Sequence, residues 1–258
     1  MARPKIGVSM LYCLAEPFSE MIGRIPQTES KYVEIVDDGL HTLDKRRVSK
    51  LKELGDSYDL EFTVHAPFAG INIAMPSRLL LTATLRRLKQ SITNAGTLGS
   101  RLWVFHPAMK TGISMFYPGK DWVRNLENVR LLVKFAENEG VRVGLENVAE
   151  PFIMRNVENF RAFYSEFDGN VGFVLDTGHA NMNGQLAGFL TELPDKMVHI
   201  HAHDNDGRTD QHLGIGRGNI DWESFAALVK EADFGDVVSV ESVEHVKESV
   251  DKLKQLLA

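Results

Sequence analysis

The stretch VGFVLDTGH, residues 171–179, is a short apolar run that ends in an aspartate and a histidine. Similar endings recur along the chain in EFTVH (61–65), LWVFH (102–106), VRVGLE (141–146), MVHIH (197–201) and VVSVE (237–241). A continuous apolar run of this length is typical of a strand in a parallel sheet with both faces covered. Because the active sites of parallel barrels lie at the carboxyl ends of the strands, the pattern predicts one site assembled from many strands.

Longer amphipathic segments separate these runs, and strands that alternate with helices are typical of a closed (β/α)8 TIM barrel. An open doubly wound sheet is the alternative, but no Gly-x-Gly-x-x-Gly follows the first strand. The length of 258 residues and the absence of a linker predict a single TIM-barrel domain, 1–258. The expected strands are 5–9, 32–36, 60–65, 102–106, 141–146, 171–176, 197–201 and 237–241, and the expected helices are 44–54, 77–96, 122–138, 157–167, 222–232 and 244–257.

The composition, 43% apolar and 25% charged residues, is that of an ordinary globular protein. No apolar stretch is long enough to cross a bilayer and no signal-peptide core precedes the first strand, so we expect no membrane contact and a cytoplasmic location. The single cysteine, Cys13, suits a reducing compartment and leaves nitrogen and oxygen as the metal ligands. The formal charge of −6 gives no indication of a nucleic-acid surface.

Four side chains, Glu146, Asp176, His201 and Glu241, stand at the ends of the fifth to eighth expected strands. In a barrel these positions converge on one side of the mouth. Imidazole and carboxylate together are ligands of Zn²⁺, Mn²⁺ and Co²⁺, whereas carboxylates alone suit Mg²⁺. The alternative for each acid alone is a helix cap or a surface charge. Their convergence predicts a divalent-metal site.

Five further side chains could extend this site to a second or third ion. His65 and His106 end the third and fourth expected strands, and His179 follows Asp176 by three residues. Asp210 and His212 lie in a long glycine-rich loop, which suggests a functional segment rather than a connector. Taken separately, His65 and His106 could each simply precede a turn, and His179 could pack on the next helix. The segment from Asp210 to His212 could form an Asx turn.

The run HIHAHD, residues 199–204, places three imidazoles on one face of an extended strand. His201 stands where the run ends and is the expected ligand. His199 is deeper and is expected to be a hydrogen-bonded core residue, while His203 is expected just outside the metal, near the substrate. His41 and His245 have no motif around them and are expected on the surface.

Seven strings in this order resemble the xylose isomerase-like TIM-barrel superfamily, which includes endonuclease IV and the sugar and sugar phosphate isomerases and epimerases. The resemblance covers about residues 5–245, almost the whole chain. The strings are TVHAPF (63–68), VFHP (104–107), LEN (145–147), LDTGHAN (175–181), HIHAHDN (199–205), DQHLGIG (210–216) and VE (240–241).

One branch of this family implies sugar epimerisation. A single divalent ion would be held by Glu146, Asp176, His201 and Glu241, and it would bind adjacent oxygens of an open ketose. Glu146 and Glu241 would remove and return a proton beside the carbonyl through an enediolate. The branch pattern places a second glutamate where this chain has Phe152.

The endonuclease IV branch implies three zinc ions held by nine positions, which would cleave a phosphodiester at an abasic site. This chain fills all nine: His65, His106, Glu146, Asp176, His179, His201, Asp210, His212 and Glu241. The segment VDDGLHTLD, residues 36–44, is short and acidic, whereas a surface that follows DNA phosphates needs Lys or Arg. Phe68 could insert into DNA or could roof a small-molecule pocket, and we favour the pocket.

The sequence therefore favours a metal-dependent isomerase or epimerase of a small sugar or sugar phosphate, using one to three ions of Zn, Mn, Co or Mg. Phe68, His203, Arg208 and Arg217 are the expected substrate contacts, the two arginines as partners of a phosphate. An endonuclease IV-like zinc phosphodiesterase is the alternative, and DNA is a partner only in that case. A metal-dependent sugar binder without turnover is a further alternative, and a homo-oligomer is possible.

Overall fold

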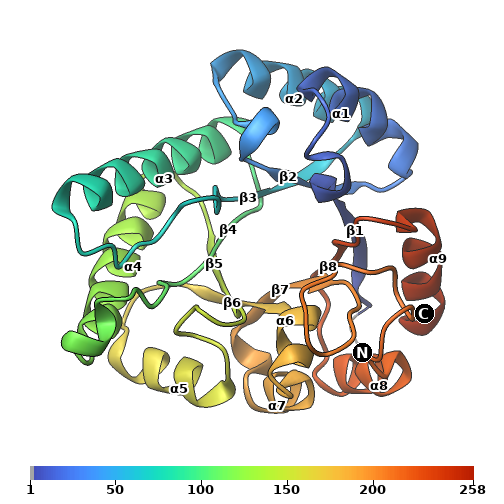
Figure 1. Ribbon diagram of the computed structural model, residues 1–258. Coiled ribbons are helices and arrows are strands. Elements are labelled where there is room, and N and C mark those ends of the chain that lie inside the picture. Colours follow the sequence, from blue (N-terminus) through green and yellow to red (C-terminus); the bar gives the residue numbers. More distant parts are fainter. Residues whose placement is uncertain (1–2) are drawn as a thin grey trace.

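The computed structural model describes residues 3–258. Its parallel strands close into one barrel in sequence order, β1 to β8 (Figure 1). Closure is direct, because β1 pairs with β8 from Lys5 opposite Val237 to Val8 opposite Val240. This pairing confirms the barrel and excludes an open sheet. The strands are β1 Lys5–Ser9, β2 Tyr32–Val36, β3 Glu61–His65, β4 Leu102–Phe105, β5 Val143–Glu146, β6 Gly172–Asp176, β7 Met197–Ala202 and β8 Val237–Val240.

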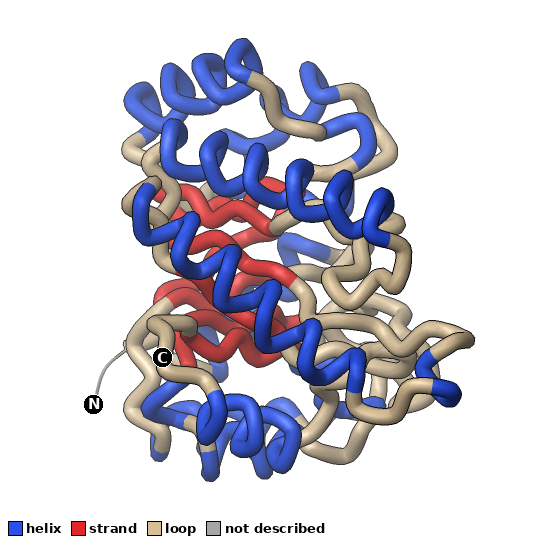
Figure 2. The backbone as a smooth tube through the Cα atoms, turned by 90° about the vertical axis from the view of Figure 1, so that its left-hand side faces the viewer, coloured by secondary structure: helices blue, strands red, loops and turns tan. Residues whose placement is uncertain are grey.

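The helices surround the strands (Figures 1 and 2). Within residues 3–258 none of them is both long and apolar enough to cross a membrane. The six expected helices are confirmed with shifted ends, whereas α1, α6 and α7 were not expected because each is short. The helices are α1 Phe18–Arg24, α2 Lys45–Tyr58, α3 Arg78–Leu98, α4 Lys120–Asn138, α5 Val157–Glu166, α6 Thr177–Met182, α7 Leu186–Glu192, α8 Trp222–Glu231 and α9 Val246–Leu256.

Alternation along β4 shows how the core is divided. Trp103 is fully buried on the helix side of the sheet, where its indole N–H donates to the Ser91 hydroxyl of α3 at 3.0 Å. Leu102 and Val104 point the other way, since neighbouring strand residues face opposite sides. They form a separate buried cluster with Val174 of β6. Apolar side chains therefore fill this part of the barrel axis, whereas the buried Glu34 and His199 lie within β2 and β7.

Candidate metal centre

Buried polar side chains gather at the carboxyl ends of β3 to β8. His65 ends β3, Glu146 ends β5, Asp176 ends β6, His201 lies near the end of β7, and Glu241 directly follows β8. All five are at most 4% exposed. Beside them lies a cavity of about 260 Å³, the mouth cavity, lined by Leu11, Val36, His65, Phe68, His106, Glu146, Val148, Phe152, His179, Asp210, His212 and Glu241.

Glu146 lies at the middle of the cluster. Its Oε2 atom is 3.4 Å from His65 Nε2, 3.5 Å from His106 Nε2 and 3.4 Å from His201 Nδ1. Its Oε1 atom is 3.3 Å from His179 Nδ1. Although Oε2 is buried, it accepts no hydrogen bond among the described residues. One carboxylate thus faces four imidazoles without a hydrogen bond to its inner oxygen.

The Nδ1 atom of His201 is also buried without a hydrogen bond among residues 3–258. It lies 3.4 Å from Glu146 Oε2 and 3.6 Å from Glu241 Oε2. The other ring nitrogen, Nε2, is 2.9 Å from the carboxylate of Glu34 on β2. Two carboxylates that converge on one ring nitrogen repel each other unless a positive charge, from a proton or a metal cation, lies between them. These unsatisfied atoms fit a divalent cation.

Asp176, which ends β6 and directly precedes α6, belongs to the same group. It caps this helix, because Oδ1 accepts the backbone N–H of His179 at 2.6 Å. The ring of the fully buried His203 lies 3.1 Å from Asp176 Oδ2. The helix cap and the metal-ligand role, which were alternatives in the sequence, are therefore compatible in the structure.

Asp210 and His212 reach the centre from the loop after β7. Asp210 Oδ2 is 3.2 Å from His179 Nε2 and 3.3 Å from His212 Nε2. The loop is held by Asp204, which exchanges backbone hydrogen bonds with Leu213 at 2.9 and 2.8 Å. Its buried carboxylate also accepts from the Trp222 indole at 2.8 Å. These contacts hold the two ends of the loop together, and Asp210 and His212 lie between them.

Among the described residues, eight of the nine predicted ligands belong to overlapping groups of potential ligand atoms, and Asp210 is in none of these groups. Potential ligand atoms of His65, His106 and Glu146 lie within 4.8 Å of one another. The same is true of Glu146, Asp176 and His179, and of His65, His201 and Glu241. The donors are imidazole nitrogens and carboxylate oxygens, the set that Zn²⁺ and Mn²⁺ accept. Glu146 belongs to more than one group, so neighbouring ions would share it.

Comparison with known proteins identifies the family. The family model described as "Xylose isomerase-like TIM barrel" matches residues 27–257. The chain belongs to this family. The sequence-based assignment to the xylose isomerase-like superfamily is therefore confirmed.

Within the xylose isomerase-like family, relatives with different names are similar to this chain. An uncharacterized protein of Methanocaldococcus jannaschii, MJ1311, is 32% identical and covers 98% of this chain and 88% of its own. A solved structure of a D-tagatose 3-epimerase-like protein is 31% identical, with a TM-score of 0.92 over 98% of this chain and 97% of its own. A probable endonuclease 4 of Aquifex aeolicus is 29% identical over 66% of each chain. Sugar epimerase and endonuclease names thus both occur among the relatives.

The structure places the four expected substrate contacts in different surroundings. The Phe68 ring lines the mouth cavity, 5.7 Å from the ring of His65 and 5.9 Å from that of His106. His203 is fully buried and stacks on His212 at 3.9 Å between ring centres. Arg208 and Arg217 are exposed and are not among the residues that line this cavity.

Other residues near the mouth were missed or misplaced by the sequence. Phe152 lines the cavity opposite Phe68, 5.4 Å from the His106 ring. Glu34 was not expected, because a single acid inside the run YVEIV carries no motif. The expectation that His41 lies on the surface is wrong. It is fully buried, and its Nε2 lies 3.0 Å from the Glu16 carbonyl oxygen, since β2 continues into a loop folded under α1.

Proton release should accompany metal uptake. Burial lowers the pKa of His65, but the Glu146 carboxylate more than reverses this and raises it to about 9. Burial likewise lowers the pKa of His212, and Asp210 raises it to about 9. Both rings are therefore protonated at pH 7 in the metal-free protein, whereas a metal ligand must be neutral. Apparent zinc affinity should increase as the pH rises towards 9.

Calorimetric titration of the metal-free protein with Zn²⁺ at pH 7 checks this expectation. In two buffers of different ionisation enthalpy, the measured heats of zinc binding should differ. The difference should correspond to the release of about one or more protons per ion. Equal heats in both buffers would mean that these rings are already neutral.

Proposed function

We propose that this protein is a divalent-metal-dependent isomerase or epimerase of a small sugar. The observation that carries the proposal is that Glu146 and Glu241 both line the mouth cavity and both approach His201 Nδ1, at 3.4 and 3.6 Å. Two carboxylates beside one substrate carbon are what a proton removal and return on opposite faces requires. A bound divalent ion would polarise the neighbouring carbonyl as a Lewis acid.

The two carboxyl groups are in different electrostatic environments. The pKa of Glu241 is raised, mainly by burial. The pKa of Glu146 lies well below its ordinary value, because the surrounding imidazoles outweigh the effect of burial. A pair whose pKa values are separated in this way suits a division into proton donor and proton acceptor. Glu241 is accordingly the group that we expect to carry the proton between steps.

The walls of the mouth cavity indicate the class of substrate. Phe68, Phe152, Leu11 and Val148 provide apolar surface, and no Lys or Arg is among its described lining residues. A ketose could lay its C–H surface on these walls while its oxygens face the ligand cluster. A phosphate would find no cationic side chain there, and Arg208 and Arg217 lie elsewhere. We therefore favour an uncharged sugar over a sugar phosphate.

Hydrogen exchange with solvent tests this proposal without knowledge of the product. The protein, saturated with Mn²⁺ or Zn²⁺, would be incubated with D-tagatose in D₂O, and the C3 proton followed by NMR. We expect loss of the C3 proton signal, and no loss after treatment with a chelator. If several ketoses bind only with metal but none exchanges, the protein is a sugar binder and the proposed activity is wrong.

A zinc phosphodiesterase that acts at abasic sites is the second candidate. The observation that favours it is that Asp210 Oδ2 lies close to both His179 Nε2 and His212 Nε2, contacts that a single-ion epimerase does not need. The name of the Aquifex relative points the same way. The loop after β2 is acidic, however, with Asp38 turned inward to accept the backbone N–H groups of Phe68 and Ala69 at 2.9 and 2.8 Å. That loop offers no cation to a DNA backbone.

His106→Ala separates the two candidates. If three ions are needed for phosphodiester cleavage, this variant should lose about one zinc per chain and all abasic-site cleavage, because His106 faces the shared Glu146. Elemental analysis and an abasic oligonucleotide provide the measurements, and the control is His245→Ala, at the exposed residue directly before α9, which does not line the cavity. Cleavage retained at the wild-type rate would contradict a three-zinc mechanism.

A further inference from the structure

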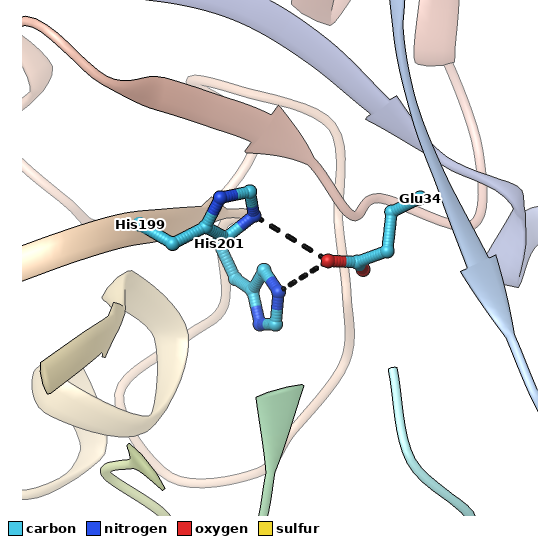
Figure 3. A group of neighbouring side chains, drawn as sticks. All are labelled: Glu34, His199 and His201. Carbon is cyan, nitrogen blue, oxygen red and sulfur yellow. Dashed lines mark hydrogen bonds and ion pairs between the residues drawn. The ribbon is translucent and has the colours of Figure 1, made fainter. Parts of the chain in front are cut away.

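We infer that Glu34 is a positioning residue for the metal centre, because it fixes His201 in the tautomer whose Nδ1 atom faces the ligand cluster. The inference rests on the proposed metal centre but not on the identity of the reaction. Glu34 lies in the middle of β2 and is 1% exposed. Its Oε2 atom is 2.9 Å from His201 Nε2 (Figure 3).

The tautomer follows from the chemistry of this contact. A buried carboxylate beside two imidazoles is ionised and can only accept hydrogen bonds. His201 Nε2 must therefore carry the hydrogen and donate it to Glu34. In the neutral ring Nδ1 is then a bare lone pair, and this is the atom that points at Glu146 Oε2 and Glu241 Oε2. The lone pair that a metal requires is thus exposed at the centre.

The other imidazoles of the centre are oriented differently. The Nδ1 atoms of His65, His179 and His212 lie 2.8, 3.1 and 2.9 Å from the backbone carbonyl oxygens of Ala66, Asn147 and Glu241. In His65 and His212 Nδ1 donates to the backbone and Nε2 is left for the centre, whereas Nδ1 of His179 also lies 3.3 Å from Glu146 Oε1. His201 has the reverse arrangement, with a side-chain carboxylate as its acceptor. Its orientation can therefore be removed by a single substitution, unlike theirs.

Charge gives Glu34 a second effect on the same ion. A carboxylate hydrogen-bonded to a ligand imidazole increases the basicity of that ring, whereas a neutral carbonyl does so less. The effect is directed at the position bounded by His201, Glu146 and Glu241. It should not extend to the position bounded by His179, Asp210 and His212, whose rings do not contact Glu34. Removal of the Glu34 charge should therefore weaken the binding of one ion and leave the affinity for any other ion unchanged.

Glu34 acts through His201 rather than on a substrate. It is not among the residues that line the mouth cavity, whereas Val36, two positions further along the same face of β2, is. His199 also approaches Oε2 of Glu34, with Nε2 at 3.4 Å (Figure 3). Oε1 of Glu34 accepts no hydrogen bond among the described residues. The carboxylate thus lies beneath the floor of the site.

The test is Glu34→Gln, which keeps the shape of the side chain and removes its charge. Zn²⁺ would be titrated into metal-free protein against a chromophoric chelator. We expect one class of ion to bind about 10- to 100-fold more weakly and any other class to be unchanged. Nitrogen-15 NMR of the metal-free wild type, at a pH high enough to make His201 neutral, should show the hydrogen on Nε2, and the variant should show a mixture of tautomers.

Asp37→Asn is the matched control, because Asp37 is equally buried but is paired with Arg87 at 2.6 Å. It should lower the melting temperature without a selective change in zinc affinity. Unchanged zinc binding in Glu34→Gln, an equal weakening of two or more distinct ions, or a neutral wild-type His201 with the hydrogen on Nδ1 would overturn the inference. Since none of these readouts uses a sugar, failure of the proposed activity would leave them unaffected.

Discussion

Glu241→Gln is expected to slow exchange of the D-tagatose C3 proton with solvent by about 10²- to 10⁴-fold, the usual contribution of a general acid or base. The amide cannot take up or return a proton, while its shape still fills the position after β8. Because Glu241 is also a candidate ligand, the assay is run at saturating Mn²⁺, with the bound metal measured in the same sample. Loss of exchange with metal retained would assign the proton transfer to this carboxylate.

Glu244→Gln is the control for this prediction, since it makes the same change three residues later at an exposed position. It should exchange at the wild-type rate. Exchange that is undiminished in Glu241→Gln would rule out Glu241 as the base and would leave Glu146 as the remaining carboxylate of the proposed pair.

Glu146→Gln should have the largest effect on metal content. The carboxylate faces His65, His106 and His201 through one oxygen and His179 through the other. Substitution of a residue that only supports a ligand already weakens metal binding about 10- to 100-fold, so loss of a shared ligand should cost at least about 100-fold. Elemental analysis after dialysis should show less metal per chain than in the wild type, and sugar exchange should be lost.

Glu150→Gln tests whether this result depends on position. Glu150 is exposed and pairs with Arg155 outside the mouth cavity, so its variant should keep the wild-type metal content. If Glu146→Gln also kept it, Glu146 would not be a ligand. The proposed centre would then have to be rebuilt around the remaining donors.

The sequence by itself determined the barrel and most of the ligand cluster. Most of the barrel strands read as apolar runs because they are covered on both faces, and the polar residues that end the runs from the third strand onward mark the mouth. The ends of parallel strands converge, so His65, Glu146, Asp176, His201 and Glu241 could be placed together from their positions in the chain. His179 followed from its short spacing to Asp176.

Only the tertiary structure decided how these donors are grouped and what surrounds them. Glu34 and Phe152 have no local signal, because their roles come from side chains that lie far away in sequence and close in space. The exposure of Arg208 and Arg217 likewise depends on how the loop after β7 folds over Asp204. Which nitrogen of His201 is free depends on a contact 167 residues away, between β2 and β7 across the closed barrel. Sequence spacing does not encode such a contact, since packing across the barrel fixes it.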